Sequence, residues 1–253
     1  ISAFLPAVLA ASGLPTLSQG VKEMGPKFGI THSQVLAEAG VNVDLSVQQA
    51  NERLNNAEVS WSFIDQQYAT AELFALQDLR TRMIKRPSLA TLEKLVMPIK
   101  ARGKTHLQIG FVHKAYPPVL AKLAQQAGFD SALIIRGIEG GILPTLREES
   151  NCFQSTVGIA EDYVLNPRDF GIEQTTRGLL AAEGTEVTAE QTVELALQAL
   201  SGQTGVAFDS LVLGAASALY HCGIQDSQQL AADHVREILK SGRAKAFFEQ
   251  GTA

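Results

Sequence analysis

The chain has 253 residues, of which 45% are hydrophobic and 19% charged, and its formal net charge is −5. This composition is ordinary for one large globular domain with a buried core. Two cysteines, Cys152 and Cys222, are too few for a disulfide scaffold, and no apolar run approaches the roughly 20 residues that span a bilayer. We therefore expect a single domain over residues 1–253, with free thiols in a reducing cytoplasm and no membrane segment.

The first hundred residues alternate helical and extended patterns. Glycine stops, N-cap residues and apolar spacing predict helices over residues 2–12, 33–39, 47–56 and 70–82. Extended segments are expected at 15–18 and 59–64. Between them, a glycine-bearing loop runs from Gly20 to Gly29. The chain begins at Ile1 rather than at Met, directly in the first apolar helix, which suggests a fragment of a longer protein.

The second half contains the strongest strand signals and then becomes helical. Strands are expected over residues 105–113 and 131–137, separated by a helix over 117–127. Further helices are expected over residues 189–200, 207–222 and 227–239. Alternation of strands and helices predicts an α/β fold with a mostly parallel central sheet flanked by helices.

Ligands of open parallel sheets bind beyond the carboxyl ends of the strands. This rule points to residues 112–117, to residues 136–144 and to the loop 20–29. The segment 136–144 contains three glycines, Gly137 among them, and one carboxylate, Glu139. It is either a plain tight turn or a loop that lets backbone approach a phosphate, since no established phosphate-loop spacing is present. Glu139 alone is a poor ligand set for Mg²⁺.

Two histidines lie where a ligand could reach them. His113 follows a predicted strand, but no serine, cysteine or second histidine stands near it in the sequence. His32 lies near a predicted helix start, where backbone amides favour anions. No Ser/His/Asp order and no metal-ligand spacing stands out.

Residues 80–104 are strongly basic, with eight Lys or Arg residues against the single acid Glu93, a net charge of +7. The cations are Arg80, Arg82, Lys85, Arg86, Lys94, Lys100, Arg102 and Lys104. Like charges this close repel one another unless solvent, nearby acids or a counter-anion relieve them. The segment is therefore either a solvated edge or a site for a polyanion such as a phosphorylated sugar or a nucleic-acid backbone.

Several motifs resemble those of anthranilate phosphoribosyltransferases. They are residues 1–20, EAGVNVDLS (38–46), YVLNPRDFG (163–171) and FDSLVLGAASALYHCGIQDS (208–227). The resemblance covers essentially the whole chain. It implies the catalytic domain of glycosyltransferase family 3, shared with nucleoside phosphorylases, and a missing N-terminal helical domain that carries a glycine-rich diphosphate loop. It also implies a homodimer in the full-length protein.

The same resemblance places the candidate substrate-binding residues. The family's Lys-His-Gly-Asn-Arg segment falls on 18–22 and keeps Gly20 and a cation, Lys22. Its serine-rich phosphate segment falls on 27–34, with Lys27 and His32. Two of its arginines fall on Arg80 and Arg86.

The family's magnesium-binding Asp-Glu pair falls on Ile142 and Leu143, whose apolar side chains cannot coordinate a hard cation. Mg²⁺ is therefore expected only if phosphoribosyl diphosphate is still bound. The positions at which the sequence departs from the family's motifs resemble those of a bacterial paralogue group, some members of which bind nucleic acid.

Three functions remain open. The first is phosphoribosyl or glycosyl transfer to an unknown acceptor, with Gly20, Lys22, Lys27, His32, Arg80, Arg86, His113, Gly137 and Glu139 around the substrate. The second is nucleic-acid binding without catalysis, through Arg82, Lys85, Lys94, Lys100, Arg102 and Lys104. The third is a degenerate domain that serves dimerisation. Genuine transfer to anthranilate is a minor part of the first possibility.

Overall fold

A computed structural model describes residues 1–23, 29–83, 88–179 and 187–252, apart from the side chain of Glu139. The strands are β1 (Thr16–Gly20), β2 (Trp61–Asp65), β3 (His106–Gly110), β4 (Ser131–Ile135), β5 (Ser150–Thr156) and β6 (Ile159–Leu165). The helices of the first half are α1 (Leu5–Ala11), α2 (His32–Glu38), α3 (Val47–Asn55), α4 (Gln66–Ala69), α5 (Ala71–Phe74), α6 (Gln77–Arg82), α7 (Leu89–Leu92) and α8 (Pro117–Gln126). Those of the second half are α9 (Ala189–Leu200), α10 (Val206–His221), α11 (Gln228–Lys240) and α12 (Arg243–Gln250). Short 3-10 turns are η1 (Ser2–Phe4), η2 (Glu93–Leu95), η3 (Ile138–Gly140) and η4 (Pro167–Phe170).

The strands form two sheets. β1 and β2 pair in parallel, and the second sheet has the order β3-β4-β5-β6. In that second sheet β3 and β4 are parallel, whereas β5 is antiparallel to both β4 and β6. The predicted α/β class, with a central sheet flanked by helices, is confirmed, but the four-stranded sheet is not mostly parallel as expected, because it has one parallel and two antiparallel strand pairs. The antiparallel β5–β6 hairpin was not anticipated, because exposed residues on the edge strand β6 give it no apolar periodicity.

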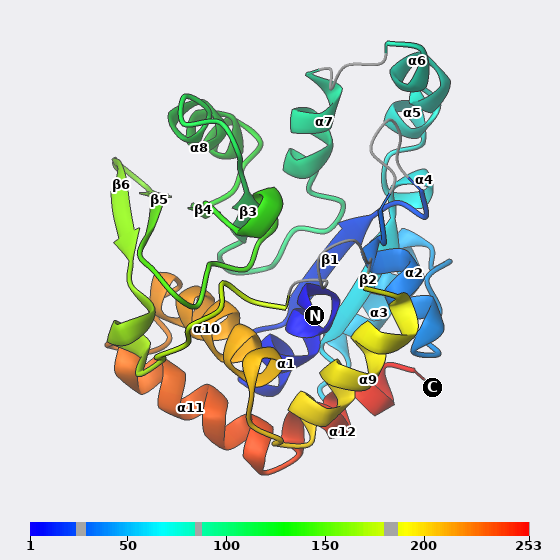
Figure 1. The fold of residues 1–253 in the computed structure, drawn as a ribbon. Helices are drawn as coiled ribbons and strands as arrows, with labels where there is room; N and C mark the ends of the chain where they lie inside the picture. Colours follow the sequence, from blue (N-terminus) through cyan, green and yellow to red (C-terminus); the bar gives the residue numbers. More distant parts are fainter. Residues whose placement is uncertain (24–28, 84–87, 180–186, 253) are drawn as a thin grey trace.

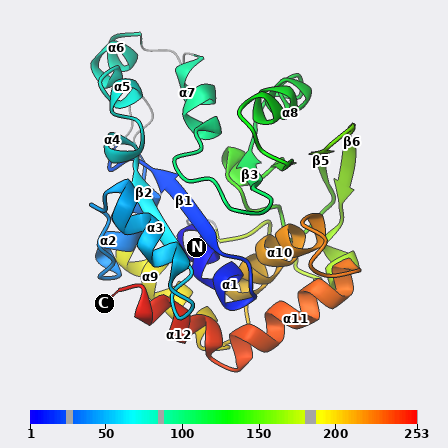
Figure 2. The same cartoon turned by 180° about the vertical axis from the view of Figure 1, so that it is seen from behind.

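Helices cover both faces of the four-stranded sheet. Leu133 and Ile135 of β4 join the larger core, which α1 and α10–α12 also build, whereas Ala132 and Ile134 join a smaller core with α8. Figures 1 and 2 show α10 and α11 passing beneath the strands, with α8 on the other side. Helices α10 and α11 of the second half thus cover one side of this sheet.

Helix boundaries follow the capping residues. Ser46 caps α3 as predicted, in a reciprocal capping box with Gln49, and Thr31 with Gln34 does the same for α2. The helix predicted over 70–82 is wrong in detail, because the structure has two separate short helices there, α5 and α6, with α4 directly before them. Thr70 lies between α4 and α5 with φ −153° and ψ 72°, which no α-helix accommodates. Helix α12 was also not predicted.

Helix α12 ends against a buried tryptophan. The indole of Trp61 is fully buried, stacks on Phe248 with ring centroids 5.6 Å apart, and donates a hydrogen bond to the carbonyl of Phe247 at 2.8 Å. Gly251, directly after α12, lies so close to the indole ring that a Cβ there would stand 2.6 Å from Nε1. The C-terminal helix is thereby fixed to β2.

A buried polar network ties α10 to the second sheet. The hydroxyl of Ser131 lies 2.7 Å from Nδ1 of His106 and 2.9 Å from Nε2 of His221. Burial, with a smaller contribution from His106, lowers the pKa of His221 to about 4. Both histidines are therefore neutral partners of one hydroxyl at neutral pH.

Gly251→Ala is expected to destabilise the protein by about 1–3 kcal/mol, because the added methyl overlaps the indole of Trp61. Urea unfolding followed by tryptophan fluorescence measures this. Gly103→Ala is the control, since nothing lies within 4 Å of a Cβ at that glycine. Equal stabilities of the two variants would contradict the packing described here.

The free energy of unfolding is expected to fall as the pH decreases from about 6.5 to about 4. The pKa of His221 is lower in the folded than in the unfolded chain, so the unfolded chain binds the proton first and stability present above pH 6.5 is lost. In His221→Gln the loss over this range should be smaller by about 3 kcal/mol. An NMR titration of the His221 ring with a midpoint near 6.5 would contradict this account.

Candidate functional site

The glycine loop after β4 folds tightly onto the end of β3. A Cβ at Gly110 would overlap the carbonyl oxygens of Gly140 and Gly141, and one at Gly137 would overlap the carbonyl of Gly141. The loop is closed by hydrogen bonds from Gly141 N to Ile138 O at 2.9 Å and from Ile138 N to Leu143 O at 3.2 Å. Backbone thus fills the space beyond these strands, which is why glycines are required here.

The residues after this loop turn toward the protein interior. Ile142 and Leu143 pack against the larger core, and Leu143 Cδ2 would lie 2.5 Å from a Cβ on Gly214 of α10. A hard divalent cation requires oxygen ligands, and these two side chains offer none. The two positions that resemble a magnesium pair therefore do not fit that metal. Within the described ranges, no group of three His, Cys, Asp or Glu side chains could hold a metal ion.

A lysine and a buried carboxylate lie at the ends of β1 and β2. Gly20 pairs with Asp65 across the two strands, and Lys22 follows two residues later. Lys22 is exposed and forms an ion pair with Asp44 at 2.8 Å, and that hydrogen bond raises its pKa. Asp65 is 1% exposed, accepts a hydrogen bond from the backbone N–H of Gln67 at 2.9 Å, and has its pKa raised by burial.

Sequence reasoning missed Asp65 as a member of this group. The available signal was its position as the last residue of a buried strand. In a parallel pair that is where ligand-facing side chains lie.

His32 is not a cation in this fold. It opens α2, and its Nε2 lies 2.7 Å from the hydroxyl of Ser2. Burial lowers its pKa to about 4, so the ring is neutral at neutral pH. The neutral ring of His32 can therefore offer a phosphate a single N–H donor at most.

The basic segment does not form one continuous surface. Arg80 is buried and forms an ion pair with Glu93, which connects α6 to η2. Lys94 donates a hydrogen bond to the carbonyl of Gly110 at 3.0 Å and so brings an ammonium group to the end of β3.

Four further cations are exposed on α6 and on the loop before β3, and within the described ranges none has a salt-bridge partner; they are Arg82, Lys100, Arg102 and Lys104.

The remaining predicted residues are placed as follows. His113 is exposed after β3, with its ring 5.7 Å from that of Tyr116. Lys27, Lys85, Arg86 and the side chain of Glu139 lie outside the described residues. The structure thus brings Lys22, Lys94 and the loop of Gly137 to the carboxyl ends of the strands, whereas His32 and Arg80 are occupied by partners within the chain.

The described residues include no helix that is both long and apolar enough to cross a membrane.

Curated relatives match nearly the whole chain. The anthranilate phosphoribosyltransferase of Alkaliphilus metalliredigens is 24% identical over 249 residues, which are 96% of this chain and 69% of that protein. The enzyme of the same name from Methanobrevibacter smithii is 26% identical over 244 residues, again 96% of this chain and 69% of the relative.

Solved structures show the same fold. Anthranilate phosphoribosyltransferase from Thermus thermophilus superposes with a TM-score of 0.79 at 19% identity, covering 99% of this chain and 71% of that one. The Saccharomyces cerevisiae enzyme, solved in complex with PRPP and Mg, gives a TM-score of 0.78 at 14% identity, covering 98% and 68%. The family model described as glycosyl transferase family, a/b domain, matches residues 1–245. The chain therefore belongs to this glycosyl transferase family, as an α/β domain similar to anthranilate phosphoribosyltransferases.

Proposed function

We propose that this domain binds a phosphate-bearing ligand at the carboxyl ends of β1 and β3 without magnesium-assisted diphosphate chemistry. The proposal rests on which side chains lie at this edge of the structure: two are apolar and two carry ammonium groups. Apolar Ile142 and Leu143 pack into the core, whereas the ammonium groups of Lys22 and Lys94 remain beside the strand ends. The ammonium groups attract anions, whereas Ile142 and Leu143 supply no oxygen ligand for a metal.

Lys22 is suited to bind phosphate because its present partner is weakly held. Its ion pair with Asp44 is exposed, with side-chain exposures of 54% and 47%, and exposed pairs of this kind contribute little to stability. A phosphate oxygen can therefore replace the carboxylate at small cost. Asp65 is buried beside this lysine at the end of β2, and its charge helps to raise the pKa of Lys22.

Any group transfer at this site would depend on positioning and electrostatic stabilisation. Among the described residues no side chain near Lys22 forms a nucleophile–base pair, and His32, with its lowered pKa, is a weak base. Phosphoribosyl diphosphate is the natural probe, because a solved relative was crystallised with PRPP and Mg. We do not extend the proposal to anthranilate as the acceptor, since the loss of the acidic pair removes the charge neutralisation that helps a diphosphate leave.

Nucleic-acid binding is the second candidate. It is supported by the exposed cations Arg82, Lys100, Arg102 and Lys104, for which the described residues provide no salt-bridge partner. Clustered, solvated cations contact phosphates without reading sequence and gain affinity by releasing counterions. Few aromatic side chains accompany them, so stacking of bases is not expected to contribute.

Phosphoribosyl diphosphate is expected to bind the full-length protein with an affinity that changes less than about twofold when Mg²⁺ is replaced by EDTA. Lys22→Ala should weaken binding by about tenfold, a typical loss for one charge-assisted contact. Isothermal titration calorimetry measures both, with Lys240→Ala, an exposed lysine on α11, as the control. Binding that strictly requires Mg²⁺, or no binding at all, would refute the proposal.

Nucleic-acid binding is tested by its salt dependence. If the loop before β3 contacts phosphates, the triple variant Lys100→Ala, Arg102→Ala and Lys104→Ala should reduce the slope of log K against log salt by about one unit per lost contact. Fluorescence anisotropy with a labelled oligonucleotide gives this slope. Lys240→Ala combined with Lys245→Ala is the matched control on the C-terminal helices. An unchanged slope in the triple variant would remove this candidate.

A further inference from the structure

A hollow lies at the end of the four-stranded sheet that is opposite to the proposed phosphate site. It occupies about 300 Å³ between α8 and the turn that joins β5 to β6. Asp130 and Ser131, at the amino end of β4, form one side of it, whereas the loop of Gly137 follows the carboxyl end of β4. The hollow is therefore separate from the site proposed for phosphate, and its volume suits a small ligand.

The walls of this hollow are mainly apolar. Phe129 and Phe153, which are 9% and 7% exposed, belong to the smaller core, and both contribute to the lining. Ala121 and Ala124 of α8 form the upper wall with them. Small side chains on the helix leave room for an apolar group between the helix and the sheet.

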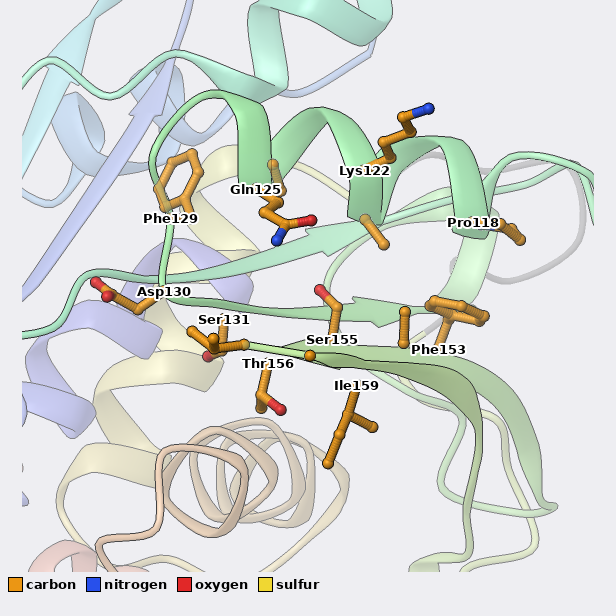
Figure 3. Close-up of a pocket in the computed structure, with 15 residues that line it drawn as sticks. Pro118, Lys122, Gln125, Phe129, Asp130, Ser131, Phe153, Ser155, Thr156 and Ile159 are labelled. Carbon is orange, nitrogen blue, oxygen red and sulfur yellow. The ribbon is translucent and has the colours of Figure 1, made fainter.

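Two neutral polar groups converge in the hollow. Figure 3 shows the amide of Gln125 reaching down from α8 and the hydroxyl of Ser155 pointing up from β5. Ser155 is only 9% exposed, and neither side chain makes a hydrogen bond with another described residue. Both groups line the hollow and are able to form a hydrogen bond with a ligand there.

No charged group points into the space between them. Lys122 lines the hollow with its aliphatic stem, but its ammonium group points away from the sheet (Figure 3). Asp130 stands at the edge, and its Oδ2 already accepts the backbone N–H of Thr105 at 2.7 Å. An anion would therefore lose hydration without gaining a counter-charge and would also approach Asp130.

From this geometry we infer a binding site for a neutral, planar ring that has a hydrogen-bond donor and acceptor side by side, as in an aromatic carboxamide or a nucleobase edge. The ring lies near Phe129 and Phe153. Its donor and acceptor pair with the amide of Gln125 and the hydroxyl of Ser155. The inference does not depend on the proposed phosphate site.

Benzamide and benzoate have nearly the same shape and differ in charge, so they are the probes. Two-dimensional ¹H–¹⁵N NMR of the full chain should show benzamide shifting the amides of Ser155, Thr156 and Phe129 with millimolar affinity. Benzoate should bind at least fivefold more weakly. Gln125→Leu and Ser155→Val should each weaken benzamide binding at least threefold, because each removes one hydrogen-bonding partner.

Lys122→Gln is the control on the same helix and should leave benzamide binding unchanged. Gln125 is exposed on α8, so its variant should fold even if Ser155→Val does not. The inference is overturned if benzamide shifts no resonance around the hollow, if benzoate binds equally well, or if Gln125→Leu binds benzamide like the parent chain.

Discussion

The close approach of backbone to backbone beyond β3 and β4 determines the rest of the candidate site. Gly110 and Gly137 have no room for a Cβ, because the carbonyls of Gly140 and Gly141 occupy that space. The loop therefore closes over the strand ends and directs Ile142 and Leu143 into the core. Apolar side chains thus pack against the core at the two positions that resemble a magnesium pair.

The electrostatic character of the edge follows from that packing. Lys94 at the end of β3 and Lys22 at the end of β1 each bring an ammonium group to the strand ends. The two lysines differ in their partners. Lys94 donates a hydrogen bond to the carbonyl of Gly110, whereas Lys22 forms an exposed ion pair with Asp44 that a ligand can replace. The edge thus combines one fixed ammonium group with one that is able to change partners, an arrangement suited to a ligand that brings its own negative charge.

The basic segment shows how clustering in sequence differs from clustering in space. Arg80 and Glu93 form a buried ion pair, and removing one member would leave an uncompensated charge in the interior. Arg80 therefore stabilises the connection between α6 and η2, whatever further role it has. Among the described residues of the segment Arg80 is buried, whereas Arg82, Lys94 and the cations of the loop before β3 are exposed.

Local patterns in the sequence determined the α/β class, most strands and long helices, and the capping of α3 by Ser46. These features depend on neighbours within a few residues, which a sequence displays directly. Tertiary structure alone decided that Glu93 neutralises Arg80, that Ser2 holds His32, and that Asp65 lies beside Lys22, because these partners are separated along the chain and meet only when the sheets form. Tertiary structure also decided the β5–β6 hairpin, because the pairing of an edge strand leaves little trace in the apolar periodicity of the sequence.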